Sequence, residues 1–296
     1  MAIVTDIANF YPLRADANDD AGSNNGSVVG VSFVASGSGF DVAQFGAGDR
    51  IDCGASSAFS ISGSGDFTVS AWVNPTSTAL TFGQIFGSVV TASSSPQYTG
   101  FQFVITAGVL RFRLGGGGAF EDLDYTLPGG FAGAWHHVAI TRSGTTGTIY
   151  VDGAQVSTTT FSATYNTYTT TANHKMAIGA FYNIFGSAWV SNYSGDMSDV
   201  ADWTRALSGA EITQIHAAGL GQLAALMQLE AQGLFASVVH DLPTGPPIYA
   251  RTLFASVVHE GTAAPSGGGS TTQGDAIQGT RLQGRGLQGN SLQGGS

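Results

Sequence analysis

Apolar and polar residues alternate with a period of two along most of the first 205 positions, which predicts β-strands with one buried face. The clearest example is residues 133–142 (GAWHHVAITR), where Val138 and Ile140 fall on one face and His137 and Ala139 on the other. Such alternation is typical of a sheet that packs on one side only. The pattern therefore predicts a fold made mainly of β-strands.

The residues after this strand predict a hairpin. Residues 143–147 are rich in Gly, Ser and Thr, which favours a turn, and residues 149–151 (IYV) resume a strand. Asp152 and Gly153 then form a dipeptide that is common in tight hairpin turns. Three strands joined by short turns are thus expected in this part of the chain.

A second hairpin is predicted upstream. In residues 109–114 the apolar side chains of Leu110, Phe112 and Leu114 alternate with arginines, which indicates a strand with one solvated face. Residues 101–105 (FQFVI) predict its partner strand. The four glycines at 115–118 predict a flexible loop.

Two helices are predicted near residue 210. Ser208 is a favourable N-cap and Glu211 follows at the capping-box spacing, so a helix is expected over residues 209–217. Residues 223–231 (LAALMQLEA) have high helix propensity and one apolar face. That face requires a partner surface, either on the preceding domain or on a neighbouring subunit.

Composition narrows the class of protein. The 296 residues suit one large domain with an appendage, and 43 glycines with only 10% charged residues suit short strands and tight turns. With a net charge of −10 and Lys175 as the single lysine, a nucleic-acid or anionic membrane partner is not expected. The lone Cys53 excludes a disulfide within the chain and is expected to be a small core residue. We expect no spanning helix and no secretory signal.

Several motifs follow one another in a familiar order. Residues 135–139 (WHHVA), a turn and residues 149–153 (IYVDG) resemble the centre of the laminin-G-like, concanavalin-A-like lectin and glucanase jelly-roll domains. Other strands and the terminal helix of that family are matched by residues 10–13 (FYPL), 39–45, 50–53, 67–73 (FTVSAWV), 194–203 and 205–212 (RALSGAEI). The resemblance covers residues 8–219. It implies an all-β, concanavalin-A-like jelly-roll β-sandwich with a short terminal helix, and a binding protein more often than an enzyme.

Catalytic residues of the related glycosidases are missing. Laminarinase-type jelly rolls carry Glu-x-Asp-x-x-Glu, because an acid and a nucleophile must flank one glycosidic bond. The chain has only four glutamates, and the nearest match, residues 121–124 (EDLD), has the wrong order. Glu211 is assigned to the helix cap. We therefore expect no enzymatic activity and no catalytic residues.

Two groups of residues are candidate metal ligands, the adjacent histidines and the carboxylates of the opening loop and closing strand. His136 and His137 are adjacent in a strand and point to opposite faces, so they cannot easily chelate one ion and are assigned a structural role. Some relatives bind a structural calcium ion between the opening loop and the closing strand, where this chain offers Asp16, Asn18, Asp19, Asp20, Asp196 and Asp199. Asp-rich loops are also ordinary solvated turns, so both interpretations stay open. No other cofactor is expected.

Glycan binding requires aromatic side chains among fixed polar groups. The richest region is residues 165–193, with Tyr165, Tyr168, Phe181, Tyr182, Phe185, Trp189 and Tyr193. Tyr182 and Trp189 are the candidate ligand-binding residues. The alternative is that these aromatics cover the core or contact another subunit. Trp72 and Trp135 occur in strand patterns and are expected in the core.

The chain changes character after Gly233. Residues 234–240 (LFASVVH) recur without change at residues 253–259, and each copy is apolar and β-prone. An exposed segment of this kind would pair with other strands, so we expect it to make an assembly contact through Phe235, Val238, Phe254 and Val257. Beyond a Gly/Ser-rich linker, an aliphatic residue precedes Gln-Gly at Ile277, Leu282, Leu287 and Leu292.

The predicted organisation is a jelly roll at 1–219, a connecting helix at 220–233, the twin segments at 234–260, and a linker with a repeat tail at 261–296. Lectin-like jelly rolls usually act outside cells, yet no export signal or disulfide is expected here. A location on a virion would account for both observations, because virion proteins are made in the host cytoplasm and are exposed to the outside after lysis.

The expected function is therefore that of a non-enzymatic structural or adhesion protein of a phage-like virion, on the capsid or the tail. The C-terminal arm would bind other virion proteins in a homo-oligomer, and the jelly roll would face outward toward host-surface glycans. The alternative is a free carbohydrate-binding module or an inactive relative of a jelly-roll glycoside hydrolase.

Overall fold

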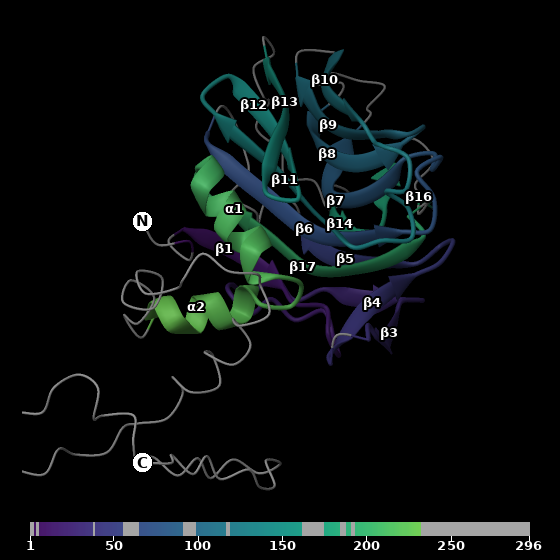
Figure 1. Ribbon diagram of the computed structural model, residues 1–296. Coiled ribbons are helices and arrows are strands. Elements are labelled where there is room, and N and C mark those ends of the chain that lie inside the picture. Colours follow the sequence, from purple (N-terminus) through teal and green to yellow (C-terminus); the bar gives the residue numbers. More distant parts are fainter. Residues whose placement is uncertain are drawn as a thin grey trace, which may run out of the picture. The chain divides into compact units, whose positions relative to one another are not determined.

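The computed structural model describes residues 3, 6–37, 39–55, 65–90, 99–116, 119–161, 175–183, 188–190 and 193–231. The chain divides into two units, residues 1–250 and 251–296, and every described residue belongs to the first. This unit is a sandwich of two antiparallel sheets with two helices (Figure 1). The segments 234–240 and 253–259 and the Gln-Gly tail lie outside the described residues, as do Phe235, Val238, Phe254 and Val257.

Sheet A is the larger layer of the sandwich. Its strands follow the order β13 (Ala154–Thr160), β12 (Thr146–Val151), β11 (His136–Ser143), β6 (Phe67–Pro75), β17 (Gly195–Trp203), β4 (Asp41–Phe45) and β3 (Ser32–Ala35), and β1 (Ile7–Tyr11) pairs with β17. The central strands β6 and β17 are buried over almost their whole length.

Sheet B is the second layer. Its strands follow the order β10 (Ala119–Thr126), β9 (Val109–Gly116), β8 (Thr99–Thr106), β7 (Gly83–Val90), β14 (Lys175–Ile178), β5 (Arg50–Ala55) and β2 (Ser27–Val29). A separate hairpin consists of β15 (Phe181–Asn183) and β16 (Ala188–Val190). The β-strands predicted from the alternation and the jelly-roll sandwich implied by the family resemblance are both confirmed.

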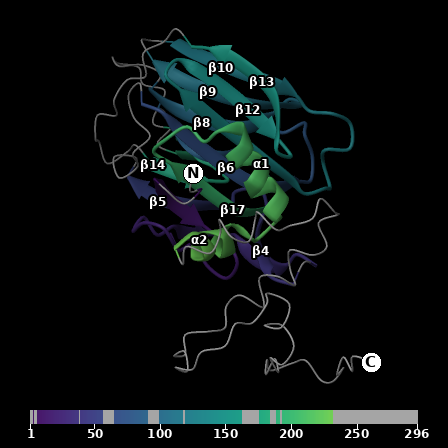
Figure 2. The ribbon, with the colours of Figure 1, turned by 60° about the vertical axis from the view of Figure 1, so that its left-hand side comes forward.

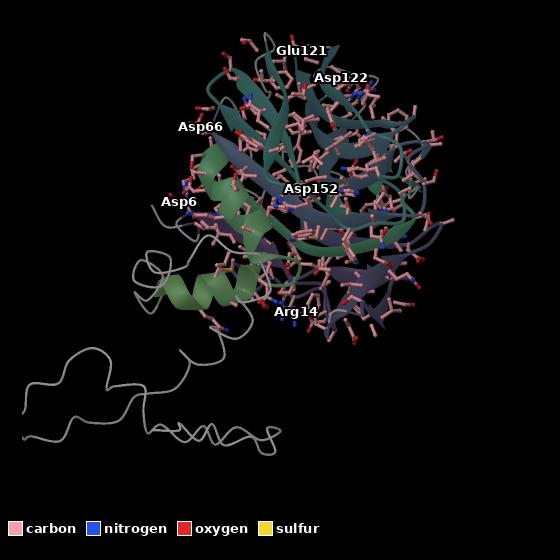
Figure 3. All side chains as sticks on the ribbon, viewed as in Figure 1. Asp6, Arg14, Asp66, Glu121, Asp122 and Asp152 are labelled. Atoms are coloured by element: carbon pink, nitrogen blue, oxygen red, sulfur yellow. The ribbon has the colours of Figure 1, made fainter. Side chains whose placement is uncertain are left out.

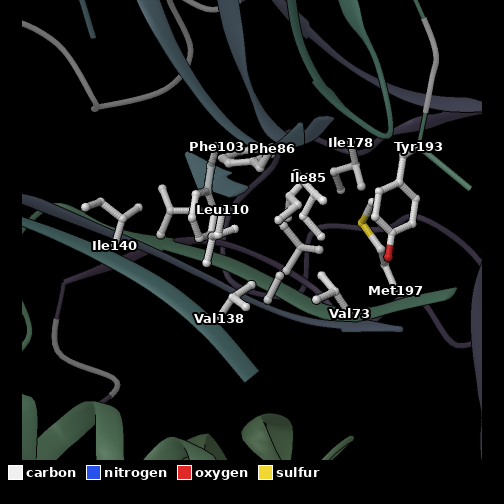
Figure 4. Close-up of a cluster of buried hydrophobic side chains, with 14 of the residues drawn as sticks. Val73, Ile85, Phe86, Phe103, Leu110, Val138, Ile140, Ile178, Tyr193 and Met197 are labelled. Atoms are coloured by element: carbon white, nitrogen blue, oxygen red, sulfur yellow. The ribbon is translucent and has the colours of Figure 1, made fainter. Parts of the chain in front are cut away.

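The core fills the space between the two sheets (Figure 4). Along β9, Leu110, Phe112 and Leu114 are buried in it, as the alternation predicts, while the two arginines between them face outward. Phe67 of sheet A has ring contacts with Phe112 of sheet B, at 5.7 Å between centroids. Burial of each such side chain contributes about 1.5–3 kcal/mol, so the interleaved aromatic rings are a major source of stability.

Local turn chemistry follows the sequence closely. Asp152 and Gly153 both have positive φ, 49° and 78°, which is the conformation of a two-residue type I′ hairpin turn between β12 and β13. The β8–β9 hairpin also forms as predicted. One expectation is wrong: Gly115 and Gly116 belong to β9, because they pair with neighbouring strands. The expectation that Trp135 lies in the core is also wrong, because this residue is half-buried and precedes β11.

Helix α1 (Gly209–Ala218) covers the outer face of sheet A (Figure 2). The capping box is present: the Ser208 hydroxyl accepts from the Glu211 amide, and the Glu211 carboxylate accepts from the Ser208 amide at 2.8 Å. The helix buries Ile212 and Ile215. His216 stacks on Trp72 of β6, with 5.7 Å between ring centroids. The predicted helix start is therefore confirmed.

Helix α2 (Leu223–Ala231) belongs to the jelly-roll unit. Its apolar residues Leu223 and Leu226 are buried, so the apolar face predicted for this helix packs on the preceding domain. The residues before it are anchored as well, because the Gly221 amide donates to the Asp199 carboxylate at 2.6 Å and Arg14 donates to the Gly221 carbonyl. None of the helices in the described part of the chain is long and apolar enough to cross a membrane.

Strand β17 carries two fully buried carboxyl groups. Asp202 accepts a hydrogen bond from Asn9 at 2.9 Å, and its other oxygen has no partner among the described residues. Burial raises the pKa of Asp202 to about 8 and the pKa of Asp199 to about 7. Desolvation in the core disfavours the charged form, so both side chains hold a proton at acidic pH.

This burial predicts a pH dependence of stability. The folded chain keeps the Asp202 proton up to about pH 8, whereas the unfolded chain loses it near pH 4, so stability falls as pH rises between these values. Asp202→Asn keeps an acceptor for Asn9 and should flatten the decline between pH 6.5 and pH 8. The slope removed should approach about 1.4 kcal/mol per pH unit.

The measurement is urea unfolding at pH 6.5, 7.25 and 8. His137, whose pKa is lowered to about 3 by burial, is neutral in the folded chain throughout this window. It is protonated only in the unfolded chain, which affects wild type and Asp202→Asn equally and so cancels in the difference between their slopes. Asp196→Asn, on the same strand with a half-exposed side chain, is the matched control. An unchanged slope in Asp202→Asn would contradict the prediction.

Candidate functional site

The outer face of sheet B carries rows of polar side chains. On β9 and β10, Arg111 donates to both carboxylate oxygens of Asp124 at 2.7 Å, and Arg113 pairs with Asp122 at 2.7 and 2.8 Å. These are cross-strand neighbours in register, so the β9–β10 hairpin fixes their geometry. Asp122 is labelled at the β10 side of the sandwich in Figure 3. The planar groups are held rigidly and remain partly exposed.

Aromatic residues lie beside these rows. Arg113 packs over the Phe120 ring at 4.8 Å and over Phe82 at 5.8 Å. Phe82 in turn makes an edge contact with Phe181 of β15, at 6.2 Å between centroids. The β15–β16 hairpin therefore lies on the outer side of sheet B, next to β7 and β14.

Tyr182 and Trp189 meet on this hairpin. They are direct cross-strand partners, and their rings pack edge to face with 5.2 Å between centroids. Both side chains are half-buried and neither belongs to the core cluster. The structure thus brings together the two ligand-binding candidates that the sequence singled out.

Two cations from sheet B contact the same indole. The guanidinium of Arg50 on β5 lies over the Trp189 ring at 4.8 Å, and the Lys175 ammonium of β14 lies at 5.5 Å. Lys175 also pairs with Asp52 at 2.9 Å. We call Tyr182, Trp189, Arg50, Lys175 and Asp52 the Trp189 cluster. Cation–π contacts of this kind contribute about 0.5–1 kcal/mol at exposed sites, which helps hold the hairpin on the sheet.

The other aromatics of the predicted region do not join the cluster. Tyr193 is fully buried, packs against Phe45 and donates to the Asp196 carbonyl at 3.0 Å, so it serves the core. Trp72 is buried beneath α1, as expected. Tyr165, Tyr168 and Phe185 lie outside the described residues.

Sequence reasoning missed Arg50 and Asp52. Their signal was present, because in β5 they alternate with the buried Ile51 and Cys53 and so belong to the outer face. Cys53 itself is a core residue, as predicted, and burial raises the pKa of its thiol well above the ordinary value.

The two adjacent histidines point to opposite faces, as predicted. His136 stacks on Phe131 and contacts the Asp152 carboxylate through Nδ1 at 2.7 Å. His137 is buried against Trp72 and His216, and its ring nitrogens have no hydrogen-bond partner among the described residues. Asp152, labelled near α1 in Figure 3, also accepts from the His137 amide, which supports a structural role for this pair.

The carboxylates considered for calcium lie in hydrogen-bond networks. Asp19 accepts backbone amides from Phe10, Gly22 and Asn24 at 2.9–3.0 Å, and so it orders the opening loop. Asp196 accepts from the side-chain amides of Gln44 and Asn74. In the described ranges, no three His, Cys, Asp or Glu side chains lie close enough together to hold a metal ion. Calcium binding stays a prediction.

A family profile described as the concanavalin A-like lectin/glucanases superfamily matches residues 45–213. The chain belongs to this superfamily. The matched region contains the Trp189 cluster and most strands of both sheets, while β1, β2 and β3 precede it. No curated protein sequence matches the chain.

Solved structures show the same fold. Domain 4 of an extracellular family 43 arabinanase from Geobacillus stearothermophilus, in complex with arabinotriose, aligns with a TM-score of 0.53 and 18% identity over 71% of this chain and 98% of that domain. The binding domain of Paraclostridial mosquitocidal protein 1 gives 0.52 and 14%, over 73% and 53%. The receptor-binding domain of botulinum neurotoxin type G gives 0.51 and 11%, over 72% and 51%. The chain thus spans about half the length of each of these last two binding domains.

The cluster's position predicts that its tryptophan is dispensable for folding. Trp189→Ala should lower the free energy of unfolding by less than about 2 kcal/mol, because the side chain is half-buried and outside the core. Trp203→Ala is the matched control, because Trp203 is fully buried and donates to the Ile3 carbonyl at 2.7 Å. That variant should lose about 3–5 kcal/mol in chemical denaturation. Equal losses would place Trp189 among the residues required for stability.

Proposed function

We propose that this protein is a non-enzymatic adhesion protein that binds glycans on the outer face of sheet B, with Tyr182 and Trp189 as the aromatic contacts. The observation that carries the proposal is the pairing of these two half-buried rings beside rigid rows of planar polar groups. Sugars present apolar C–H faces and a rim of hydroxyls. A surface that combines aromatic rings with fixed donors and acceptors suits both features.

The comparisons support this assignment at the level of fold. The superfamily is named for lectins and glucanases, and the arabinanase domain with the same fold is complexed with arabinotriose. Two further structures with this fold are the binding domain of a mosquitocidal protein and the receptor-binding domain of a botulinum neurotoxin. In those proteins a sandwich of this kind serves as a scaffold for ligand binding. In this chain the Trp189 cluster would supply the groups that contact the ligand.

Our proposal that the protein does not hydrolyse glycans rests on its carboxylates. On the described part of the sheet B face, Asp122 and Asp124 are each bound by an arginine, and Asp52 by Lys175. A retaining or inverting glycosidase needs one carboxyl group held protonated and a second carboxylate across the scissile bond. All three carboxylates are already engaged by cations, so they do not offer the free acid and nucleophile pair that hydrolysis requires.

The glycan-binding role is testable by substitution. Trp189→Ala and Tyr182→Ala should each weaken binding to glycans by about tenfold, because each removes an aromatic contact worth about 1.4 kcal/mol. The measurement is binding of the purified protein to a glycan microarray, followed by titration calorimetry with the strongest ligands.

Tyr150→Phe, on sheet A, is the control and should bind like wild type. Incubation with the same glycans should release no reducing sugar. Wild-type affinity in both cluster variants would show that the sugar contacts lie elsewhere. Release of reducing sugar by the wild-type protein that Asp122→Asn abolishes would show that the protein is an enzyme.

We further propose that the chain is carried on a phage-like virion through its C-terminal segments, as part of a homo-oligomer. Support comes from the sequence, in the identical apolar segments 234–240 and 253–259. Each contains Phe-x-Ser-Val-Val, and residues 86–90 of β7 have the same pattern within sheet B. In β7, Phe86 and Ser88 are buried, so this pattern is compatible with a strand inside this sandwich.

The edge formed by β2 and β3 offers a place for such segments from a neighbouring copy. Residues 27–36 contain no charged side chain, and Val28 and Val29 are 40% and 39% exposed. The opposite edge is protected, since β10 is acidic and the Ser157 hydroxyl of β13 donates to the Asp124 carbonyl. Natural proteins usually protect edge strands with charge, and an uncharged apolar edge is suited to pairing with another strand.

Assembly is predicted to depend on the twin segments. Val238→Asp together with Val257→Asp would place two unpaired charges in a buried contact, which costs more than rim contacts can offset. The double variant should keep the circular dichroism of a folded β-sandwich but fail to oligomerise or to join particles. Analytical sedimentation measures the oligomeric state of the double variant, and mass spectrometry of purified particles measures its incorporation.

A protein shortened to residues 1–231 is the companion test, because it keeps the buried face of α2. It should be a folded monomer. If either protein assembles like wild type, the twin segments are not the contact.

A further inference from the structure

Arg50 stands apart from the other arginines on sheet B. Arg111 and Arg113 are both fixed by carboxylates on β10. The Arg50 backbone pairs with Val29 of β2, but its guanidinium forms no hydrogen bond or ion pair with any described residue, and its Nε atom is buried without such a partner. The only specific contact of the guanidinium among the described residues is the Trp189 ring. A donor withdrawn from water and left unpaired is destabilising, so its retention calls for an explanation.

The charge around Trp189 differs from that of the whole chain. Lys175 and Asp52 neutralise one another at 2.9 Å, and the second oxygen of Asp52 accepts from the Gly54 amide. Arg50 therefore leaves this cluster with one uncompensated positive charge, in a protein of net charge −10. The positive charge of the cluster attracts an anion, whereas the negative charge of the whole chain repels it. Only an anion that reaches the cluster is therefore stabilised.

The position of Arg50 over the indole also suits it to a ligand. A guanidinium whose face packs on an aromatic ring keeps its in-plane N–H groups for hydrogen bonding. Those groups match the two oxygens of a carboxylate in a bidentate pair. Because Trp189 limits the motion of the side chain, less conformational entropy is lost when an anion binds.

We propose that the Trp189 cluster selects acidic glycans, with Arg50 receiving the carboxylate of a uronic or sialic acid unit. The proposal rests on the glycan-binding function proposed above and names its ligand class. Tyr182 and Trp189 contact the sugar ring, and Lys175 adds a second positive end beside the indole, although its charge is already shared with Asp52.

The test compares matched ligands that differ only in charge. Titration calorimetry uses a hyaluronan hexasaccharide and 3′-sialyllactose, each compared with its own carboxyl-reduced form. The wild-type protein should bind one acidic member at least about tenfold more tightly than its neutral partner, the expected gain for a charge-assisted hydrogen bond. The pair that shows the preference identifies the acid as a uronate or a sialate.

Variants assign the preference to one residue. Arg50→Gln should lower the affinity for the acidic ligand at least about tenfold more than the affinity for its neutral partner, which removes the preference. Arg50→Lys should restore only part of the preference because it lacks the bidentate geometry. Arg111→Gln is the matched control, since it removes a charge from the same face that is already paired. It should keep the full preference.

The outcomes separate this inference from the function on which it rests. Equal binding of acidic and neutral partners, or equal effects of Arg50→Gln and Arg111→Gln, overturns the acidic selectivity but leaves glycan binding intact. Binding that Trp189→Ala does not weaken overturns the proposed site itself. Loss of acidic binding in Arg50→Gln with an unchanged melting temperature supports the inference directly.

Discussion

The structure depends on burying one face of each sheet against the other. Residues of β9 and β6 alternate strictly enough that their inward side chains fill a common core, in which Phe67 and Phe112 pack together. Because the side-chain period of a strand is two, the same alternation fixes which residues face outward. Arg111 and Arg113 reach the surface of sheet B as a result of Leu110 and Phe112 reaching the core. The candidate recognition face is thus built by the same constraint that stabilises the sandwich.

Local features could be predicted from the sequence because short-range chemistry decides them. The turn at Asp152 and Gly153 requires positive φ at both positions, and that dipeptide adopts it readily. The capping box at Ser208 satisfies helix amides with side chains three residues apart. Gly115 and Gly116 show the limit of such reasoning. Glycine favours loops by itself, but here the ladder with β8 and β10 keeps both residues in β9.

The candidate site could be predicted only in part. Tyr182 and Trp189 are close in the sequence, and their aromatic character was enough to single them out. Arg50 joins them only because β5 and β14 are neighbours in sheet B and the hairpin follows β14. This adjacency depends on the strand order of the whole sandwich, which no local pattern contains. The buried Asp202 was missed for a similar reason, since its partner Asn9 lies on the first strand.

The position of α2 has a consequence for orientation. Helix α1 covers the outer face of sheet A, and α2 is anchored to β17 of that sheet through Gly221 and Asp199. The Trp189 cluster lies on the outer face of sheet B, and Figure 1 shows α2 on the opposite side of the sandwich from β16. The last described residue, Ala231, therefore lies behind the proposed recognition face. The described sandwich thus has a back, where its last helix ends, and a front, where the Trp189 cluster lies.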